Sequence, residues 1–419
     1  MVVILLAVYA VFAPFDTLLN VTAGGTITKY VGILIILCAA VEVSRKRAIV
    51  PPGRDTYAWL AFFTLSLLSV TWAVNVNDSR TYLVTSLSLF ALFLAAASVD
   101  YTFQDVLIVA RSAVAGGTAV AIYALYLLRH ATAANIHTTA GITRLYLSLG
   151  ENVADANHTA AALLLPIALA ATFLLSAQSK REKFASAGAI FCMLAALYSS
   201  GSRGGVLGLA TLLLYFAAKS RWRKPFLAAC VSIIAMVVAV PNKILSRFAH
   251  DQGFGSGRGG IWHVGLLGFK QHWLYGAGAF NFATVFDKTF LRTNEGIFEA
   301  WHRPAHNLIL STAVDLGVIG LVVLGIVLYA QFTTLRNVMG SGRIGDIRVA
   351  LEASMLALFV VALLVDMVPR KYLWLALIQV TMLRIAARPR TRVMPSHFGG
   401  LELARQRSPF AYGMRAKHV

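Results

Sequence analysis

Three basic side chains stand directly before a long apolar run in the sequence. His302, Arg303 and His306 lie within the stretch WHRPAH, and mostly apolar residues follow from Leu308 onward. An imidazole titrates near neutral pH, so it can act as a general base or hydrogen-bond to a reacting group. We take this cluster as the candidate reaction site, although a histidine at such a position is also compatible with a helix-cap or interfacial role.

The same stretch does not predict a metal site. Pro304 separates His302 from His306 and interrupts the helix that a ligand pair at this spacing would need, and no HExxH glutamate is present. The three cysteines fall in apolar runs, where neither a disulfide framework nor a metal-ligand spacing can be built from them. They are Cys38, Cys192 and Cys230. We therefore expect chemistry without a metal or another cofactor.

Two arginines stand among glycines, Arg203 in SSGSRGG and Arg258 in FGSGRGGIW. Glycine permits close approach of a ligand to the backbone, and the turn at Arg203 also exposes N–H groups at a helix N-terminus. A guanidinium pairs with diphosphate oxygens through two hydrogen bonds, and the abundant diphosphates at an outer membrane surface are lipid-linked. The pair indicates an anion site. The alternatives are interfacial snorkelling for Arg203 and a solvated loop charge for Arg258.

The elements that position these residues are predicted to be membrane helices. Hydrophobic residues make up 58% of the 419 residues and the mean hydropathy is +0.70, whereas a soluble domain has about 45 to 50% apolar residues. Runs of roughly 17 to 25 apolar residues predict an all-α polytopic integral membrane protein with about twelve transmembrane helices. They lie near 2–19, 27–43, 57–74, 82–99, 106–128, 157–177, 184–200, 204–219, 225–241, 307–332, 350–368 and 372–387. The first is interpreted as a span because it lacks the basic n-region and cleavage site of a signal peptide.

The net charge of +19 is distributed between these runs. Lys and Arg form short clusters after the second, sixth, eighth, tenth and twelfth predicted helices, and these clusters lack the aromatic interleaving of a nucleic-acid surface. The positive-inside rule then places both termini in the cytoplasm, with residues 389–419 as a basic tail. Residues 1–388 form the predicted transmembrane domain, which includes a large, partly helical loop at 242–306 between the ninth and tenth helices. This loop and the candidate site are expected on the opposite, periplasmic side.

Within the loop, four large apolar residues recur at helical spacing. They are Trp262, Leu266, Phe269 and Trp273, and they predict an amphipathic helix at the membrane interface. The nearby GAG at 276–278 is weak evidence for nucleotide binding. Asp315 lies within the tenth span, nine residues after His306 and on roughly the opposite face of an ideal helix. We do not expect it to be the partner of His306, and it indicates either a structural hydrogen bond or a transport pathway.

The stretch from His306 to Gly320 resembles a family signature. His306 and Asn307, nine intervening residues and GVIG give HNx9GxxG, a pattern similar to that of bacterial O-antigen ligases in the ligase and polymerase superfamily. The predicted layout of about twelve helices, the two arginine turns and ADANHTAA at 154–161 also resemble this family. The resemblance covers residues 157–320 by motif and the remainder by topology. Gly317 and Gly320 are interpreted as close-packing positions of the tenth helix.

This resemblance implies a GT-C-like glycosyltransferase of the bacterial inner membrane. The family transfers O-antigen polysaccharide from undecaprenyl diphosphate to a sugar hydroxyl of lipid A core at the periplasmic face, without a metal. His306 would be the base that activates the acceptor, and inversion would follow from a single displacement. Arg203 and Arg258 would bind the donor diphosphate, with His302, Arg303 and Asn307 as candidate helpers.

Three rival functions remain. An O-antigen polymerase shares the lipid carrier, but neither Arg258 nor Arg303 has the glycine eleven residues on that polymerase loops often show. An oligosaccharyltransferase acting on protein hydroxyls is the second rival. A transporter of polyisoprenoid lipids or polysaccharides is the third, because twelve helices alone would equally support it, and Asp315 is its main argument.

Overall fold

Long helices make up most of the structure, as the apolar runs predict. The computed structural model describes residues 1–22, 25–46, 49–130, 136–139, 142–239, 258–293 and 301–388. The predicted cytoplasmic tail 389–419, the end of the predicted ninth helix at 240–241 and two parts of the predicted periplasmic loop, 242–257 and 294–300, lie outside the described residues. Nearly all of the described chain belongs to one unit, Met1–Ala387.

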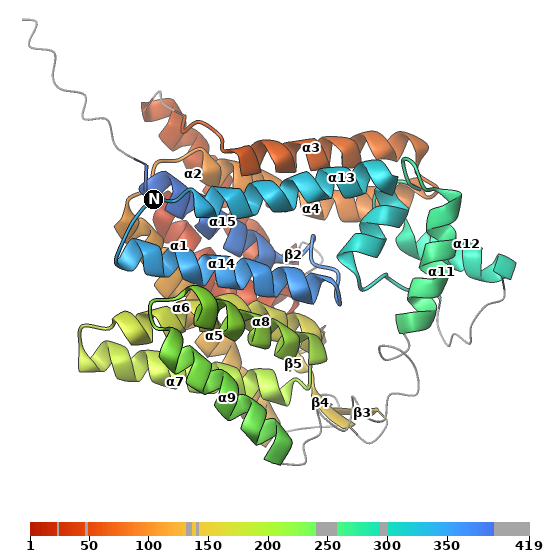
Figure 1. Ribbon diagram of the computed structural model, residues 1–419. Coiled ribbons are helices and arrows are strands. Elements are labelled where there is room, and N and C mark those ends of the chain that lie inside the picture. Colours follow the sequence, from red (N-terminus) through yellow and green to blue (C-terminus); the bar gives the residue numbers. More distant parts are fainter. Residues whose placement is uncertain are drawn as a thin grey trace, which may run out of the picture. The chain divides into compact units, whose positions relative to one another are not determined.

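Each of the twelve predicted spans coincides with a helix (Figure 1). They are α1 (Val2–Phe12), α2 (Ile27–Lys46), α3 (Arg54–Leu68), α4 (Val76–Ala97), α5 (Phe103–Arg129), α6 (Ala156–Ser176), α7 (Lys180–Ser199), α8 (Arg203–Lys219), α9 (Arg223–Ala239), α13 (Leu308–Arg336), α14 (Arg343–Ala362) and α15 (Lys371–Ala386). Five of them are long and apolar enough to cross a membrane, namely α2, α4, α5, α6 and α13. The structure is therefore that of a mostly helical protein with five candidate membrane spans, and the count of twelve crossings stays a prediction.

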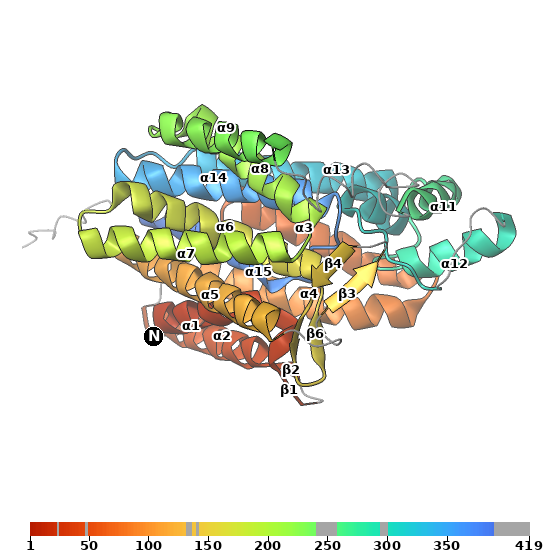
Figure 2. The ribbon, with the colours of Figure 1, turned by 90° about the horizontal axis from the view of Figure 1, so that it is seen from below.

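Three short antiparallel hairpins were not predicted from the sequence. They pair β1 (Asn20–Thr22) with β2 (Gly25–Thr26), β3 (Ile136–Thr139) with β4 (Ile142–Leu145), and β5 (Leu147–Leu149) with β6 (Asn152–Ala154). Figures 1 and 2 place them toward the same end of the helices as α11 (Arg258–Gln271) and α12 (Phe282–Thr293). The start of α13 lies at this end too, so the polar connections gather around the candidate site.

The helix α13 is broken at Gly317, where φ is +67° and ψ is −163°. The segment from Trp273 to Gly278 lies against the break and uses its free backbone groups: the carbonyl of Trp273 accepts from Val318 at 2.8 Å, and the N–H of Ala277 donates to Val314 at 2.9 Å. A Cβ at Gly317 would clash with the carbonyl oxygen of Leu274. Gly317 is thus a close-packing position, but its neighbour is a loop segment at a helix break. The GAG sequence belongs to that segment, which gives it a structural role.

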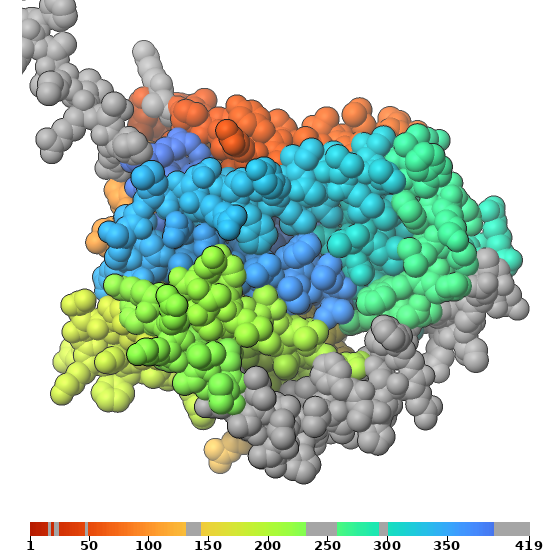
Figure 3. All heavy atoms as spheres, viewed as in Figure 1, coloured from red at the N-terminus to blue at the C-terminus, as the bar shows by residue number. Residues whose placement is uncertain are grey.

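The helices α11 and α12 pack with the start of α13 around a small apolar core. Its buried members are Ile261, Val264, Ala277, Phe282, Val285, Phe286, Ala305, Leu310 and Val314. In the space-filling view the green surface of α11 and α12 adjoins the cyan start of α13 (Figure 3). The predicted amphipathic helix is present as α11, and its place at a membrane interface stays a prediction. Leu266 is 52% exposed and Trp273, beyond the end of the helix, is 56% exposed, while Ile261 and Val264 are buried against α12 and α13.

Candidate active site

His306 lies at the entrance of α13, directly before the residue that caps the helix. The Asn307 side chain accepts hydrogen bonds from the backbone N–H groups of Ile309 and Leu310, each at 3.0 Å. On the other side, the indole N–H of Trp262 donates to the carbonyl of Ala305 at 3.0 Å. These contacts fix the chain on both sides of His306. The asparagine of the HN pair therefore caps α13, because its side-chain oxygen accepts from N–H groups that the helix leaves free.

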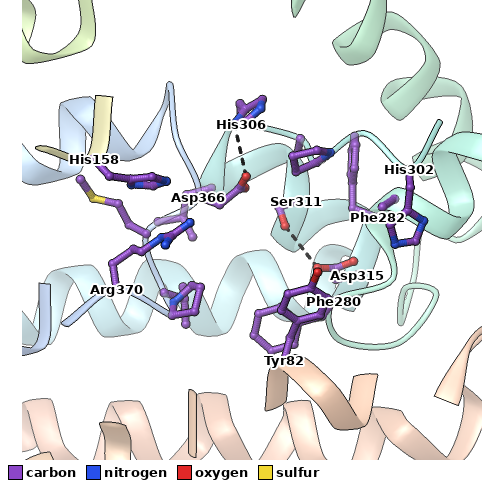
Figure 4. A pocket seen from close by; sticks show the side chains of 17 residues that line it. Tyr82, His158, Phe280, Phe282, His302, His306, Ser311, Asp315, Asp366 and Arg370 are labelled. Carbon is purple, nitrogen blue, oxygen red and sulfur yellow. Dashed lines mark hydrogen bonds and ion pairs between the residues drawn. The ribbon is translucent and has the colours of Figure 1, made fainter. Parts of the chain in front are cut away.

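A carboxylate faces the His306 ring from the connection between α14 and α15 (Figure 4). Asp366 Oδ2 lies 3.5 Å from His306 Nδ1, and the backbone N–H of His306 also interacts with this carboxylate. Burial lowers the pKa of His306, while Asp366 opposes this shift and Arg258 adds to it. The imidazole is thus kept neutral near pH 7, with Nε2 left to accept a proton. The carboxylate would favour the imidazolium that results.

A cavity of about 270 Å³ extends along His306. Figure 4 shows His158 and Arg370 at one end, His306 and Asp366 in the middle, and Tyr82, Phe280, Phe282 and His302 at the other end. These residues come from α4, α6, α12, the start of α13 and the connection before α15. The cavity therefore forms only when segments from both halves of the chain come together.

Backbone strain in the described chain is confined to this cavity. Among the described residues, the non-glycine residues with positive φ are Phe280 (+61°), His302 (+58°) and His306 (+48°), and all three line it. Each such residue costs on the order of 1 to 3 kcal/mol, and strained residues persist where the surrounding structure holds them. Such strain is typical of sites that bind or transform a ligand.

The two predicted arginines lie close enough to interact with each other. The half-buried Arg258 guanidinium, at the start of α11, has a lowered pKa, chiefly through burial and next through the nearby Arg203. Arg258 also acts on His306. A guanidinium in a protein remains charged near neutral pH, so the two cations repel each other. A bound anion would relieve that repulsion beside His306.

A third arginine, Arg144 of β4, also acts on Arg258. Its guanidinium donates to Asn157 Oδ1 at 2.9 Å, and the same oxygen accepts from the Ser202 hydroxyl at 2.9 Å. Ser202 caps α8 by accepting from the backbone N–H of Gly205 at 3.1 Å. The turn that carries Arg203 is thus tied to the β3–β4 hairpin and to the start of α6. This network explains why Ser and Asn stand beside the arginines.

The remaining predicted helpers take different positions. His302 lines the far end of the cavity, where its Nδ1 lies 3.5 Å from Asp287 Oδ2 and its Nε2 lies 3.8 Å from Asp78 Oδ2. Arg303 acts electrostatically on His306. Asp315 also lines the cavity, and it accepts from the Ser311 hydroxyl at 3.2 Å while the N–H groups of residues 280–282 face its carboxylate. Asp315 therefore holds the turn that begins α12.

At the near end of the cavity, the His158 ring lies 2.9 Å from the Tyr372 hydroxyl through Nδ1. His158 and Arg370 also line a second cavity of about 180 Å³, which continues toward Asp155 and Phe15. The two cavities meet at these two side chains. His158 was part of ADANHTAA in the sequence, but no role was predicted for it.

The sequence analysis missed Arg144, Asp366 and Arg370 as well. Arg370 lies in the short connection between the last two predicted helices, and Asp366 lies near the end of the predicted span 350–368. The orientation argument puts both on the same side as His306. Arg144 lies in the connection between the fifth and sixth helices on that side. No pattern in the sequence brings these connections together, since their contact depends on helix packing.

Among the described residues there is no group of three or more His, Cys, Asp or Glu side chains that could hold a metal ion. Comparison with known families finds a match over residues 188–325 to the family described as O-antigen ligase. The matched segment includes Arg203, Arg258, His306 and the glycines of the HNx9GxxG pattern. No curated protein matches the chain.

Proposed function

We propose that this chain is an O-antigen ligase, because residues 188–325 match the family described as O-antigen ligase. It transfers a polysaccharide from undecaprenyl diphosphate to a sugar hydroxyl of lipid A core. The reaction takes place at the periplasmic face of a bacterial inner membrane, with both termini of the chain in the cytoplasm. No metal takes part, and the products are the extended lipid A core and undecaprenyl diphosphate.

The mechanism is a single displacement with inversion. His306 Nε2 takes the proton of the acceptor hydroxyl while its oxygen bonds to the anomeric carbon of the donor. The bond between that carbon and the diphosphate oxygen breaks, and the electron pair leaves with the diphosphate. Arg258 and Arg203 stabilise the charge that develops there, and such preorganised cations typically contribute several kcal/mol. Asp366 orients the imidazole and stabilises its protonated form.

The observation that carries this proposal is that Asp366 and Arg258 both act on the His306 imidazole. Asp366 lies 3.5 Å from one ring nitrogen, and Arg258 interacts with both His306 and Arg203. A base for the nucleophile and cations for the leaving group are therefore available around one site. A transporter has less support, since Asp315, its main sequence argument, is engaged by Ser311 and the turn at residues 280–282.

The test is transfer by the purified full chain in lipid nanodiscs. It is incubated with an undecaprenyl-diphosphate-linked glycan and lipid A core, with and without EDTA, and both lipids are followed on gels. We expect lipid A core to shift to higher mass and the shift to survive the chelator. If the core is unchanged while the carrier-linked glycan lengthens, the protein is a polymerase, and if neither lipid changes, the glycosyltransferase assignment fails.

A further inference from the structure

The cavity has two chemically different ends on either side of His306. The near end holds His158 and Arg370 (Figure 4). The arginine cluster, Arg144, Arg203 and Arg258, belongs to this end. The Asn157 side chain, next to His158 in the chain, accepts at 2.9 Å from Arg144 and at 2.9 Å from Ser202, the residue before Arg203, and Arg258 interacts electrostatically with both arginines. The far end holds aromatic rings and His302. A donor diphosphate at the arginines therefore leaves the far end open.

We propose that this far end, formed by Tyr82, Phe280, Phe282 and His302, is the subsite for the acceptor saccharide. We call it the aromatic arm. The proposal rests on the proposed function and adds the place at which the second substrate binds. A single displacement requires the attacking hydroxyl and the leaving diphosphate on opposite sides of the anomeric carbon. With the diphosphate at the arginine end, the acceptor must approach His306 from the aromatic arm.

The chemistry of the arm fits a sugar. The rings of Tyr82 and Phe280 lie with their centroids 5.9 Å apart and tilted by 30°, and they offer apolar surface to the C–H face of a pyranose. The His302 imidazole and the Tyr82 hydroxyl supply hydrogen-bonding groups for sugar hydroxyls. A few placed polar groups among aromatic side chains are typical of small-molecule sites.

The arm is also held in place by specific contacts. Asp287 of α12 accepts the backbone N–H of His302 at 2.8 Å, and Asp78 of α4 faces the other side of the ring at 3.8 Å. Asp78 in turn accepts from the Thr284 hydroxyl at 2.6 Å. His302, whose backbone is left-handed, is thus fixed from α4 and α12.

The isoprenoid chain of the donor is the rival occupant. A hydrocarbon chain would have to lie beside His302 and two carboxylates, which leaves polar groups without water or partners. A separate, apolar cavity meets the main one at Leu308, Met367 and Val368 and is lined by α13, α14 and α15. Its surroundings suit a hydrocarbon chain better than the aromatic arm does.

The test measures KM for each substrate separately, with the full chain in nanodiscs. In Tyr82→Leu and His302→Gln we expect KM for lipid A core to rise about tenfold, with KM for the lipid-linked glycan within twofold of wild type. Tyr82→Phe keeps the ring and should restore most of the acceptor affinity. Tyr329→Leu is the matched control, since Tyr329 lies on α13 and is 72% exposed.

Phe280→Gly removes the ring without straining the backbone, because glycine readily adopts the left-handed conformation. The variant should therefore fold. It should also raise KM for lipid A core. An unchanged acceptor KM in these variants overturns the proposal, and a raised donor KM with unchanged acceptor KM assigns the arm to the donor instead. If wild-type protein transfers nothing to lipid A core, the proposed function itself fails, and this outcome differs from both.

Discussion

His306 and Asp366, sixty residues apart in the sequence, meet with 3.5 Å between Nδ1 and Oδ2. The imidazole stands at the start of α13 and the carboxylate in the connection that follows α14. Their contact joins the HNx9GxxG stretch to a segment that carries no recognisable motif. It also turns one ring nitrogen toward a carboxylate, so that the other faces the cavity.

Asp366→Asn should slow transfer by roughly 10²-fold or more, because the amide no longer favours the imidazolium formed in the reaction. The pH profile should move as well. Only neutral His306 can accept a proton, so activity is lost as pH falls through its pKa, which burial holds below the ordinary value. Asp366 raises that pKa, so its removal should shift the acid limb to lower pH.

The measurement is initial transfer rate between pH 4.5 and 8 for wild type and Asp366→Asn, with Asp100→Asn as an exposed control. A variant with the wild-type rate and an unmoved acid limb would mean that Asp366 has no influence on the base.

Arg258→Ala should reduce kcat/KM for the donor by about 10²-fold, since a positioned cation at the leaving group is lost. Arg258→Lys should have a kcat/KM between those of wild type and Arg258→Ala, because an ammonium keeps the charge but lacks the paired donors of a guanidinium. Arg144→Ala should lower kcat/KM for the donor less than Arg258→Ala does, because Arg144 acts through Arg258 and through its hydrogen bond to Asn157. Varying the donor at saturating lipid A core tests this, with Arg343→Ala as the control. An effect on acceptor KM alone would contradict the assignment of the arginines.

Asn307→Ala should destabilise the start of α13 by about 1 kcal/mol, the usual loss for a helix cap. Asn307→Ser keeps an acceptor oxygen and should retain both stability and activity. Thermal unfolding by tryptophan fluorescence and the transfer rate are measured together. If Asn307→Ser unfolds like wild type but is as inactive as His306→Ala, the asparagine takes part in the chemistry directly.

Gly317→Ala should lower the unfolding temperature markedly, because its backbone conformation is essentially restricted to glycine and strain there costs on the order of 1 to 3 kcal/mol. The added Cβ would also meet the backbone of Leu274 and Tyr275. Gly325→Ala in the same helix has open space around it and should be neutral or slightly stabilising. Equal unfolding temperatures for the two variants would contradict the helix break.

The helices could be predicted from the sequence because apolar runs of membrane length have few other structures available. His306 and Arg203 could be selected because their residue types stand out at the ends of such runs, and Arg258 because it stands among glycines in the loop. Asp366 could not, since its importance arises from the packing of α14 and α15 against the start of α13. The break at Gly317 was likewise invisible, because it depends on the segment from Trp273 to Gly278 that satisfies the exposed backbone groups.

The four apolar residues at helical spacing in the loop show another limit of prediction from sequence. Trp262 and Phe269 are partly buried, yet Leu266 on the same predicted face is exposed. Helical spacing identifies that a helix forms. The neighbours α12 and α13 decide which of its faces is packed.

The central claim is that His306 takes the proton of the acceptor hydroxyl. The most direct measurement is single-turnover transfer from a radiolabelled lipid-linked glycan to lipid A core, with enzyme in excess and EDTA present. His306→Ala should lower the rate by about 10² to 10⁴-fold while donor binding persists, and His130→Ala, the removal of an exposed histidine at the end of α5, should leave it unchanged. A His306→Ala protein that binds donor and transfers it at the wild-type rate would contradict the account.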